Sequence, residues 1–474
     1  MYKHISLLFI LLLPQISNSQ LVSSDSFALD YQKHALQIYR DTIAMRTAAG
    51  HNQVKVMAHY LADRFRDGGF PEDDIHIIPF VSPNGEEIAS LVVRYRGDNK
   101  SSKKPILFAA HMDVVDALRK DWIKDPFKLI EEDGYFFGRG TSDDKSGTTL
   151  LTATFLRLKK EGFTPNRDLI IAFSGDEETE MLTIEDMVEN HRNLIDAEFA
   201  INADSGGGSL DTEYHPISYQ LQAAEKTYAD FVISITNPGG HSSRPTKVNA
   251  IYDIAKALKE IEAYTFPTRS NDITLEYFRM RADAEKNQLG EAMLKFSLNP
   301  KDKVSAEIIS NHPDQVGIIK TTCIATMLSA GHAENALPQS AEANINCRLF
   351  PGIEVSEIHN KLRDIISNKN IKIRISGNPK SAPASPLRED VMDALKTTVH
   401  AQFPDLPIIP YMTTGATDGR ALRAGGIPTY GSIALFGRSE DSFAHGLNER
   451  ILVKSFFDAL EHWKILIHEL SEIK

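Results

Sequence analysis

Three short, uninterrupted apolar segments constrain the fold of this chain more than any other feature of its sequence. They are residues 106–110, 169–173 and 199–201, and none of them alternates apolar with polar residues. This pattern is typical of β-strands that are buried on both faces, as in a parallel sheet covered by helices on each side. A helix-like segment at 145–161 lies between the first two, which favours a doubly wound α/β sheet.

Each apolar segment is followed closely by residues that can ligate a metal or move a proton. His111 follows the first, the acidic run 176–178 follows the second, and Asp204 follows the third. In doubly wound sheets the functional site lies beyond the carboxyl ends of the strands. We therefore predict one site at this edge of the sheet.

The sequence pattern changes near residue 218. Segments 228–236, 322–327, 343–349 and 371–375 resemble strands, and 246–263 and 354–366 resemble helices, which predicts a small α+β domain with a sheet open on one face. A stretch rich in Pro, Ser and Ala at 377–386 predicts a linker, after which the α/β pattern returns. We expect a catalytic metal-binding domain at 20–217 and 379–474, interrupted by an inserted α+β lid or dimerisation domain at 218–378.

Residues 1–19 have the pattern of a secretory signal peptide. Lys3 precedes a mostly apolar run at 5–13, and small residues allow cleavage after Ser19. An uncleaved anchor or a buried helix is the alternative. The pattern predicts a secreted or periplasmic protein with no stable membrane anchor after cleavage. Export permits a disulfide between Cys323 and Cys347, the two cysteines of the chain, but two buried thiols fit the sequence as well.

The formal net charge of −12 makes nucleic acid an unexpected partner, because an acidic chain repels the phosphate backbone. The sequence also has no run of five basic residues. We expect no nucleic-acid binding.

Several of the candidate site residues also have a plain structural interpretation. A His-x-Asp pair such as His111 and Asp113 can be a ligand with an orienting carboxylate, or a satisfied structural pair. The acidic pair Asp143-Asp144 follows two glycines and opens a helix, so it can line a cleft or cap the helix. The acidic run 176–178 can belong to a charged cleft or to a solvated loop. Taken alone, His445 is more commonly a structural histidine.

Taken together, the candidates match the ligand count of a two-metal site. Two adjacent ions need one bridging carboxylate and a His plus a carboxylate at each end. Imidazole and carboxylate without thiolate suit Zn²⁺, Mn²⁺ or Co²⁺. One Glu is left for acid–base work. The five candidate ligands are His111, Asp143, Glu178, Asp204 and His445.

The motifs resemble those of the dinuclear zinc metallopeptidase family that contains the glutamate carboxypeptidases, aminoacylase, yeast carboxypeptidase S and succinyl-diaminopimelate desuccinylase. The resemblance runs in the family's order from about residue 45 to the end. It implies a zinc-binding α/β domain interrupted by a lid or dimerisation domain. The segments that carry it are His111-x-Asp113, Gly138-Arg139-Gly140-x-x-Asp143-Asp144-Lys145, Gly175-Asp176-Glu177-Glu178 and His445-Gly446-x-Asn448-Glu449.

The resemblance also implies a role for each site residue. Asp143 would bridge two divalent ions, most often Zn²⁺, with Co²⁺ or Mn²⁺ as alternatives. His111 and Asp204 would complete one ion site, and Glu178 and His445 the other. Asp113 would orient His111. Glu177 would be the general base, which takes a proton from the attacking water and delivers it to the leaving amine.

The resemblance also implies a substrate-binding set, which lies in the inserted domain except for Gly415. His241 would reach the scissile carbonyl oxygen, often from a dimer partner, and Asn335, Arg348 and Gly415 would bind substrate, with Arg348 suited to a free carboxylate. Without the resemblance, His241 is a loop-capping histidine and Arg348 a solvated strand residue. The chain departs from the family at Glu180, where a small residue is common, and in its long segment 278–314.

These features predict a metallohydrolase that cleaves an amide bond next to a free carboxylate in small peptides or N-acyl amino acids. A deacylase or dipeptidase of narrow specificity is the first alternative, because the same motifs serve both. A non-catalytic binding protein of the same fold is the second, but it would be expected to lose Glu177 or a ligand. A homodimer formed through the lid is the expected assembly.

Overall fold

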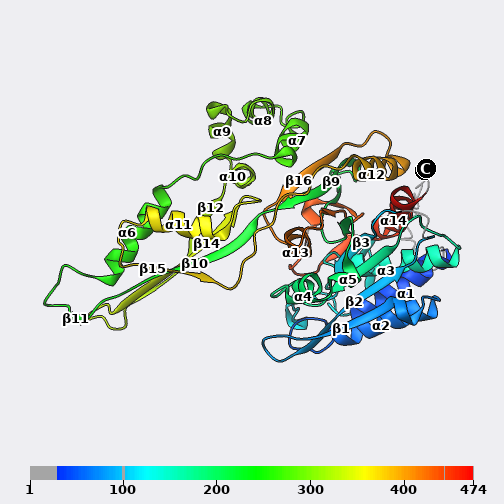
Figure 1. The fold of residues 1–474 in the computed structure, drawn as a ribbon, viewed down its shortest axis with the longest axis horizontal. Coiled ribbons are helices and arrows are strands. Elements are labelled where there is room, and N and C mark those ends of the chain that lie inside the picture. The colour runs from blue at the N-terminus through cyan, green and yellow to red at the C-terminus, as the bar shows by residue number, and fades with distance from the viewer. Residues whose placement is uncertain (1–28, 99–101, 442, 473–474) are drawn as a thin grey trace, which may run out of the picture.

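The computed structural model describes residues 29–98, 102–441 and 443–472. The proposed signal peptide at 1–19 lies outside the described residues. A larger α/β domain carries both ends of the described chain, and a narrower domain extends away from it (Figure 1). The predicted architecture of an α/β domain interrupted by a smaller α+β domain is confirmed.

A large mixed sheet organises the α/β domain. Its three central pairings, β6 with β3, β3 with β7 and β7 with β17, are parallel, and antiparallel pairs join β1 to β2 and β2 to β6 at one side. In spatial order the strands are β1 (Ile75–Val81), β2 (Glu87–Tyr95), β6 (Leu169–Ser174), β3 (Ile106–His111), β7 (Phe199–Asn202), β17 (Thr429–Gly431), β9 (Pro216–Glu225), β8 (Gly207–Leu210) and β18 (Phe436–Arg438), with β16 (Ile408–Thr413) also paired to β9.

Strand β3 shows why the apolar segments do not alternate. Ile106 and Phe108 point into one hydrophobic core, whereas Leu107 and Ala109 point into a second core on the opposite face. Each large apolar side chain buried this way contributes about 1.5–3 kcal/mol. A polar residue at any of these positions would face apolar neighbours, so the run must be continuous.

Two helical layers cover the sheet. The helices on one face are α1 (Asp30–Ala44), α2 (Val54–Asp67), α3 (Lys145–Lys160), α12 (Glu389–Gln402) and α14 (Val453–Ser471). The helices on the other face are α4 (Leu182–Asn190), α5 (Arg192–Ile195) and α13 (Asp418–Ala424). No helix in the described part of the chain is both long enough and apolar enough to cross a membrane.

The inserted domain is built on a four-stranded antiparallel sheet in the order β12 (Thr322–Ala330), β14 (Ser340–Leu349), β10 (Thr227–Thr236) and β15 (Lys372–Ser376). Helices α6 (Ala250–Ala263) and α11 (Val355–Ile365) pack on one face, and the other face is open, as the alternation in β10 predicts. The strand β9 pairs within the large sheet and reaches Glu225, so the pairing places the start of this domain at 226–227 rather than at 218.

The long segment after α6 forms a group of four short helices, α7 (Asp272–Arg281), α8 (Gln288–Leu298), α9 (Lys303–Ser310) and α10 (Pro313–Ile319). Helix α7 contacts β16, so this group bridges the two domains (Figure 1). Residues 377–388 form no helix or strand and lead back to the α/β domain, as predicted for a linker.

Two small sheets and three short 3-10 helices complete the described structure. One sheet pairs β11 (Gly240–His241) with β13 (Ala336–Leu337), and the other has the order β19 (Arg450–Leu452), β5 (Tyr135–Phe137), β4 (Ile130–Glu132). The 3-10 helices are Glu72–Asp74, Arg119–Asp121 and Ser439–Asp441.

Cys323 and Cys347 form a disulfide. They are direct partners in the antiparallel register of β12 and β14, which brings their Cα atoms to 4.0 Å. The alternative of two free thiols is therefore wrong for this structure.

Candidate metal centre and active site

The predicted site residues of the α/β domain converge at one edge of the large sheet. His111 ends β3, the acidic run 176–178 follows β6, and Asp204 follows β7. Because β3 pairs in parallel with both β6 and β7, their carboxyl ends lie side by side. The loop before α3 and the segment before β19 bring in Asp143 and His445.

Asp143 lies between the two histidines. Its Oδ1 is 2.9 Å from His111 Nε2, and its Oδ2 is 3.1 Å from His445 Nε2. His111 Nε2 is also 3.6 Å from Asp204 Oδ1, and His445 Nε2 is 2.9 Å from Glu178 Oε2. Each histidine therefore shares Asp143 and has one further carboxylate of its own, which is the arrangement predicted for two adjacent ions.

The backbone of His445 has a φ of 60°, a left-handed conformation that is costly for a residue with a Cβ. In this conformation the ring points back toward Glu178 although the loop itself is exposed.

The three side chains of the acidic run 176–178 point in different directions and have different partners. Asp176 is buried and accepts hydrogen bonds from the N–H groups of Leu182 and Thr183, where α4 begins. Glu178 points toward His445, and Glu177 is 8 % exposed with its carboxylate near His111. Glu180, the departure from the family pattern, is exposed to solvent.

Asp113 supports both sides of the site. Its backbone oxygen is 3.1 Å from His111 Nδ1, and its carboxylate Oδ1 is 3.5 Å from the same nitrogen. The two carboxylate oxygens also accept the N–H groups of Glu177 and Glu178, each at 3.0 Å. Asp113 thus holds the histidine and the main chain of the two glutamates in one arrangement.

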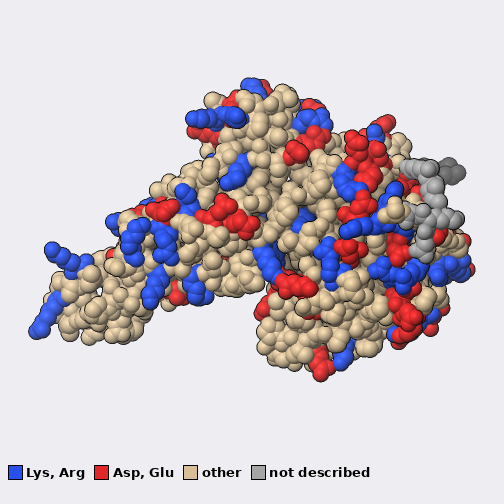
Figure 2. Space-filling view, in the orientation of Figure 1, with Lys and Arg blue, Asp and Glu red and all other residues tan. Residues whose placement is uncertain are grey.

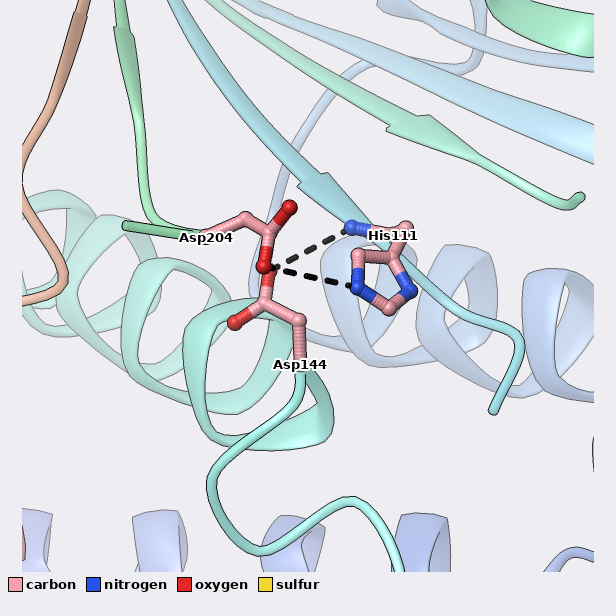
Figure 3. A group of neighbouring side chains, drawn as sticks. All are labelled: His111, Asp144 and Asp204. Atoms are coloured by element: carbon pink, nitrogen blue, oxygen red, sulfur yellow. Dashed lines mark hydrogen bonds and ion pairs between the residues drawn. The ribbon is translucent and has the colours of Figure 1, made fainter. Parts of the chain in front are cut away.

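The acidic pair before α3 was expected either to cap the helix or to line a cleft, and its two residues do one each. Asp144 caps the helix, accepting the N–H of Gly147 at 3.2 Å, whereas Asp143 faces the histidines. The peptide bond between Asp143 and Asp144 is cis. A Cβ at Gly147 would lie 2.3 Å from Asp144 Oδ1, so glycine is required there. Asp144 also belongs to a second group: its carboxylate and that of Asp204 point toward His111 (Figure 3).

Glu449 is a site residue to which sequence reasoning gave no role. It is fully buried, and its carboxylate accepts hydrogen bonds from the N–H groups of Gly140, Ser142 and Asp143 and from Arg139 Nη1 at 2.6 Å. The sequence did point to both residues, because Arg139 and Glu449 belong to two of the motifs that carry the family resemblance. The pairing itself follows only from the fold.

Burial dominates the electrostatics of the site. It raises the pKa of Glu177 well above its usual value, and the neighbouring His111 offsets this only in part. It raises the pKa of Asp204 to about 7. For Asp143 burial acts in the same direction, but hydrogen bonds with His111 and His445 outweigh it and lower the pKa. Several carboxylates in so small a volume repel one another, and bound cations would relieve this repulsion.

The residues present fit a pair of divalent ions. Three groups of ligand atoms meet here within 4.8 Å of one another: His111 with Asp144 and Asp204, His111 with Glu177 and Glu178, and Asp143 with Glu178 and His445. The donor set contains imidazole nitrogen and carboxylate oxygen and no sulfur, which suits borderline and hard divalent cations.

The expected substrate-binding residues divide into two places. Arg348 Nη1 donates to the Thr414 carbonyl at 3.0 Å, so Arg348 lies beside Gly415 at the junction of the domains. His241 and Asn335 lie together on adjoining segments, where the Ser242 N–H donates to the Asn335 carbonyl at 2.9 Å. That pair is at β11, the far end of the inserted domain, and away from the metal centre of its own chain (Figure 1).

The fold is shared with solved structures of the M20 family. The M20 family metallo-carboxypeptidase Sso-CP2 from Sulfolobus solfataricus superposes with a TM-score of 0.68 at 19% identity, covering 92% of this chain and 98% of that one. YXEP of Bacillus subtilis, described as a dinuclear metal binding peptidase from the M20 family, has a TM-score of 0.56 at 12% identity, covering 92% and 97% of the two chains.

The sequence profile of Peptidase family M20/M25/M40 matches residues 107–469, and the chain belongs to this family. A probable carboxypeptidase S-like protein 2 of Dictyostelium discoideum is 28% identical over 390 residues, 80% of this chain and 74% of its own. The human N-fatty-acyl-amino acid synthase/hydrolase PM20D1 is 27% identical over 368 residues, 75% and 72% of the two chains. Membership of this metal-dependent family makes the chain a hydrolase.

Proposed function

We propose that this protein hydrolyses an amide bond adjacent to a free carboxylate, with small peptides or N-acyl amino acids as substrates. The observation that supports this most directly is the placement of Glu177, buried beside the His111–Asp143–His445 cluster, next in sequence to a ligand candidate. The relatives named for carboxypeptidase S-like proteins and for N-fatty-acyl-amino acid hydrolysis favour the same two substrate classes.

Glu177 acts as the general base in this proposal. Burial raises the pKa of Glu177, and a carboxylate with a raised pKa is a stronger base than an exposed one. It takes the proton of the attacking water and delivers it to the nitrogen of the leaving amine. Two divalent ions, Zn²⁺ by the chemistry of the donor set, with Co²⁺ or Mn²⁺ as alternatives, would acidify the water and polarise the scissile carbonyl.

Arg348 binds the substrate carboxylate in this proposal. Burial lowers the pKa of its guanidinium, and the ring of Tyr228 lies 4.5 Å from it. One nitrogen donates to the Thr414 carbonyl, which fixes the plane of the guanidinium and leaves further N–H groups for a planar anion. Gly415 is exposed beside it, and its backbone N–H, which donates to Thr413 Oγ1 at 3.2 Å, would exchange this bond for one to the substrate.

A screen of dipeptides and N-acyl amino acids, with metal analysis of the same sample, tests the function. Glu177→Gln should retain the metals and lose most of its turnover, by about 10²–10⁴-fold as for other general bases. Glu180→Gln is the matched control, because Glu180 lies in the same acidic stretch but faces solvent. Full activity in Glu177→Gln would show that another group is the base, and cleavage of no amide substrate by the wild type would overturn the function.

We further propose that the protein forms a homodimer through the inserted domain. The strand β12 is an edge of its sheet and exposes Ile324, Met327 and Leu328, at 64%, 72% and 63%. An exposed apolar edge strand is a template for pairing with another chain. Basic side chains lie at the far end of the same domain (Figure 2). Arg244 and Lys247, which follow β11 in sequence, are exposed, and positive charge there complements the acidic metal centre of a second copy.

Light scattering during gel filtration tests the assembly. The wild type should have the mass of a dimer, and Leu328→Lys should shift it to a monomer. Leu298→Lys, an exposed leucine on α8, should leave the mass unchanged. A monomeric wild type would refute the dimer and leave His241 without a role at the metal centre.

We also propose that the protein is exported and is secreted or periplasmic. The signal-like residues 1–19 and the Cys323–Cys347 disulfide support the same compartment, because disulfides persist in oxidising surroundings. N-terminal sequencing of the mature protein should begin at Gln20, and Met1 at the N-terminus would contradict cleavage.

A further inference from the structure

A cavity of about 480 Å³ adjoins the metal centre. Its wall includes Ser142, Asp143 and Asp204, so it borders two of the candidate ligands. Its volume lies within the range of about 300–1,000 Å³ that is usual for small-molecule pockets. We name it the acyl cavity for the ligand argued below.

Apolar side chains form much of the wall beyond the ligands. They come from β8, from the start of β9, from the segment that joins β17 to β18 and from the first residue of β18. The residues are Leu210, Ile217, Ile433, Leu435 and Phe436.

Apart from the candidate ligands Asp143 and Asp204, the charged groups of the acyl cavity are paired. Asp441 accepts hydrogen bonds from Arg438 Nε at 2.8 Å, Arg450 Nε at 3.0 Å and the Tyr135 hydroxyl at 2.9 Å. Arg438 also pairs with Glu440 at 2.7 Å. Both arginines of the wall are thus paired with acids, so beyond Asp143 and Asp204 the wall offers a ligand no unpaired charge.

The acyl cavity is separate from the proposed carboxylate site. Among the described residues, neither Arg348 nor Gly415 is part of its wall. An N-acyl amino acid has its carboxylate on the amine side of the scissile bond and its acyl group on the carbonyl side. When the carboxylate is held at Arg348 and the carbonyl is at the metal centre, the space left beside Asp143 and Asp204 belongs to the acyl group.

We propose that the acyl cavity binds the hydrocarbon chain of an N-acyl amino acid, so that the preferred substrates carry a long unbranched acyl group. This inference rests on the proposed function and narrows its substrate class. Burial of each methylene should raise kcat/KM by about fourfold until the chain fills the cavity, from about 0.8 kcal/mol per CH₂.

A chain-length series tests the inference. N-acetyl, N-butanoyl, N-octanoyl and N-dodecanoyl derivatives of one amino acid are compared, and the readout is the ratio of kcat/KM for octanoyl to that for acetyl. The wild-type ratio should exceed ten. Ile217→Asp and Leu210→Asp each place a carboxylate in the wall, the first at a side chain that is 53% exposed and the second at a partly buried one, and each should lower the ratio at least tenfold. Leu298→Asp, exposed on α8, is the control and should leave the ratio unchanged.

The outcomes separate the inference from the function on which it rests. A wild type with no chain-length preference, or wall variants that leave the ratio unchanged, overturns the inference. Cleavage of dipeptides but of no N-acyl amino acid overturns it too, while the proposed amide hydrolysis stands. Cleavage of neither class overturns the proposed function itself.

Discussion

Glu449 holds the main chain of Asp143, a residue 306 positions earlier, through a hydrogen bond of 3.0 Å from the Asp143 N–H to its Oε1. The same carboxylate accepts Arg139 Nη1 at 2.6 Å, and both side chains are buried. The bridging position of Asp143 between two histidines therefore depends on an acid that contacts neither of them.

Replacing Glu449 should weaken metal binding. Glu449→Gln removes the charge opposite Arg139 and places an amide N–H₂ against backbone donors, so the loop before α3 loses its anchor. We expect metal affinity to fall about 10–100-fold, as for other groups that support ligands. Metal retention in a chelator titration measures this, with Glu440→Gln, an exposed acid nearby, as the control. Unaltered retention would mean that the loop holds Asp143 without Glu449.

Replacing Arg348 should impair substrate binding more than turnover. A charge-assisted hydrogen bond contributes about 1.5–3 kcal/mol, so Arg348→Ala should raise KM for free-acid substrates about 10–150-fold. Metal content should stay the same. Steady-state kinetics with a free acid and with its carboxamide measure the effect, and Arg374→Ala on β15 is the control. Equal cleavage of acid and carboxamide by the wild type would refute carboxylate recognition.

His462 should make the protein less stable in mild acid. Burial lowers the pKa of this histidine on α14 to about 3, from a usual 6.5. The folded chain keeps the ring neutral while the unfolded chain takes up a proton below pH 6.5, so stability is lost as the pH falls from 6.5 toward 3. At pH 5 the loss is about 2 kcal/mol.

His462→Phe should remove this dependence. Its ring can keep the stacking on Tyr219, whose hydroxyl retains Ser432 as a partner at 2.6 Å. Denaturant unfolding at pH 7 and pH 5 gives the free energy of unfolding of both proteins. The wild type should lose about 2 kcal/mol more than the variant between the two pH values. The same loss in both proteins would contradict a neutral buried ring.

Removing the disulfide should destabilise the inserted domain. The bond closes a loop of 24 residues, which corresponds to about 3 kcal/mol in the chain-entropy estimate. The double variant Cys323→Ser, Cys347→Ser should unfold at lower denaturant concentration, with amide exchange rising in β12 and β14. Alkylation of the unfolded, unreduced wild type should modify neither cysteine, and modification of both would show free thiols.

The strands of the site were predictable because burial on both faces imposes an apolar run that is visible in sequence. In β3 every residue before His111 contacts one of two cores, so the segment and its catalytic end could be identified together. Local helix chemistry was also predictable: the Asp143-Asp144 pair opens α3 as expected.

Three features could not be predicted because they depend on contacts between distant segments. The Arg139–Glu449 pair joins residues 310 positions apart, and the disulfide depends on the register of β12 against β14. The place of His241 at the far end of the inserted domain depends on the lengths and direction of β10 and β14. The boundary near 218 was misplaced because β9 is apolar and extended like the strand that follows it, and only its pairing assigns it to the large sheet.

The chain passes between the two domains at two places in the described structure, at Lys226 between β9 and β10 and in the segment 377–388. A line can be drawn through these two connections. Rotation of the inserted domain about that line is the relative motion of the two domains that stretches neither connection. At one end of the line Lys226 is buried, with its Nζ donating to the Lys320 carbonyl at 2.7 Å, so the pivot is tied to the end of α10. A rotation of the inserted domain relative to the α/β domain would therefore be described by a single angle, and the contact of α7 with β16 would oppose it on one side.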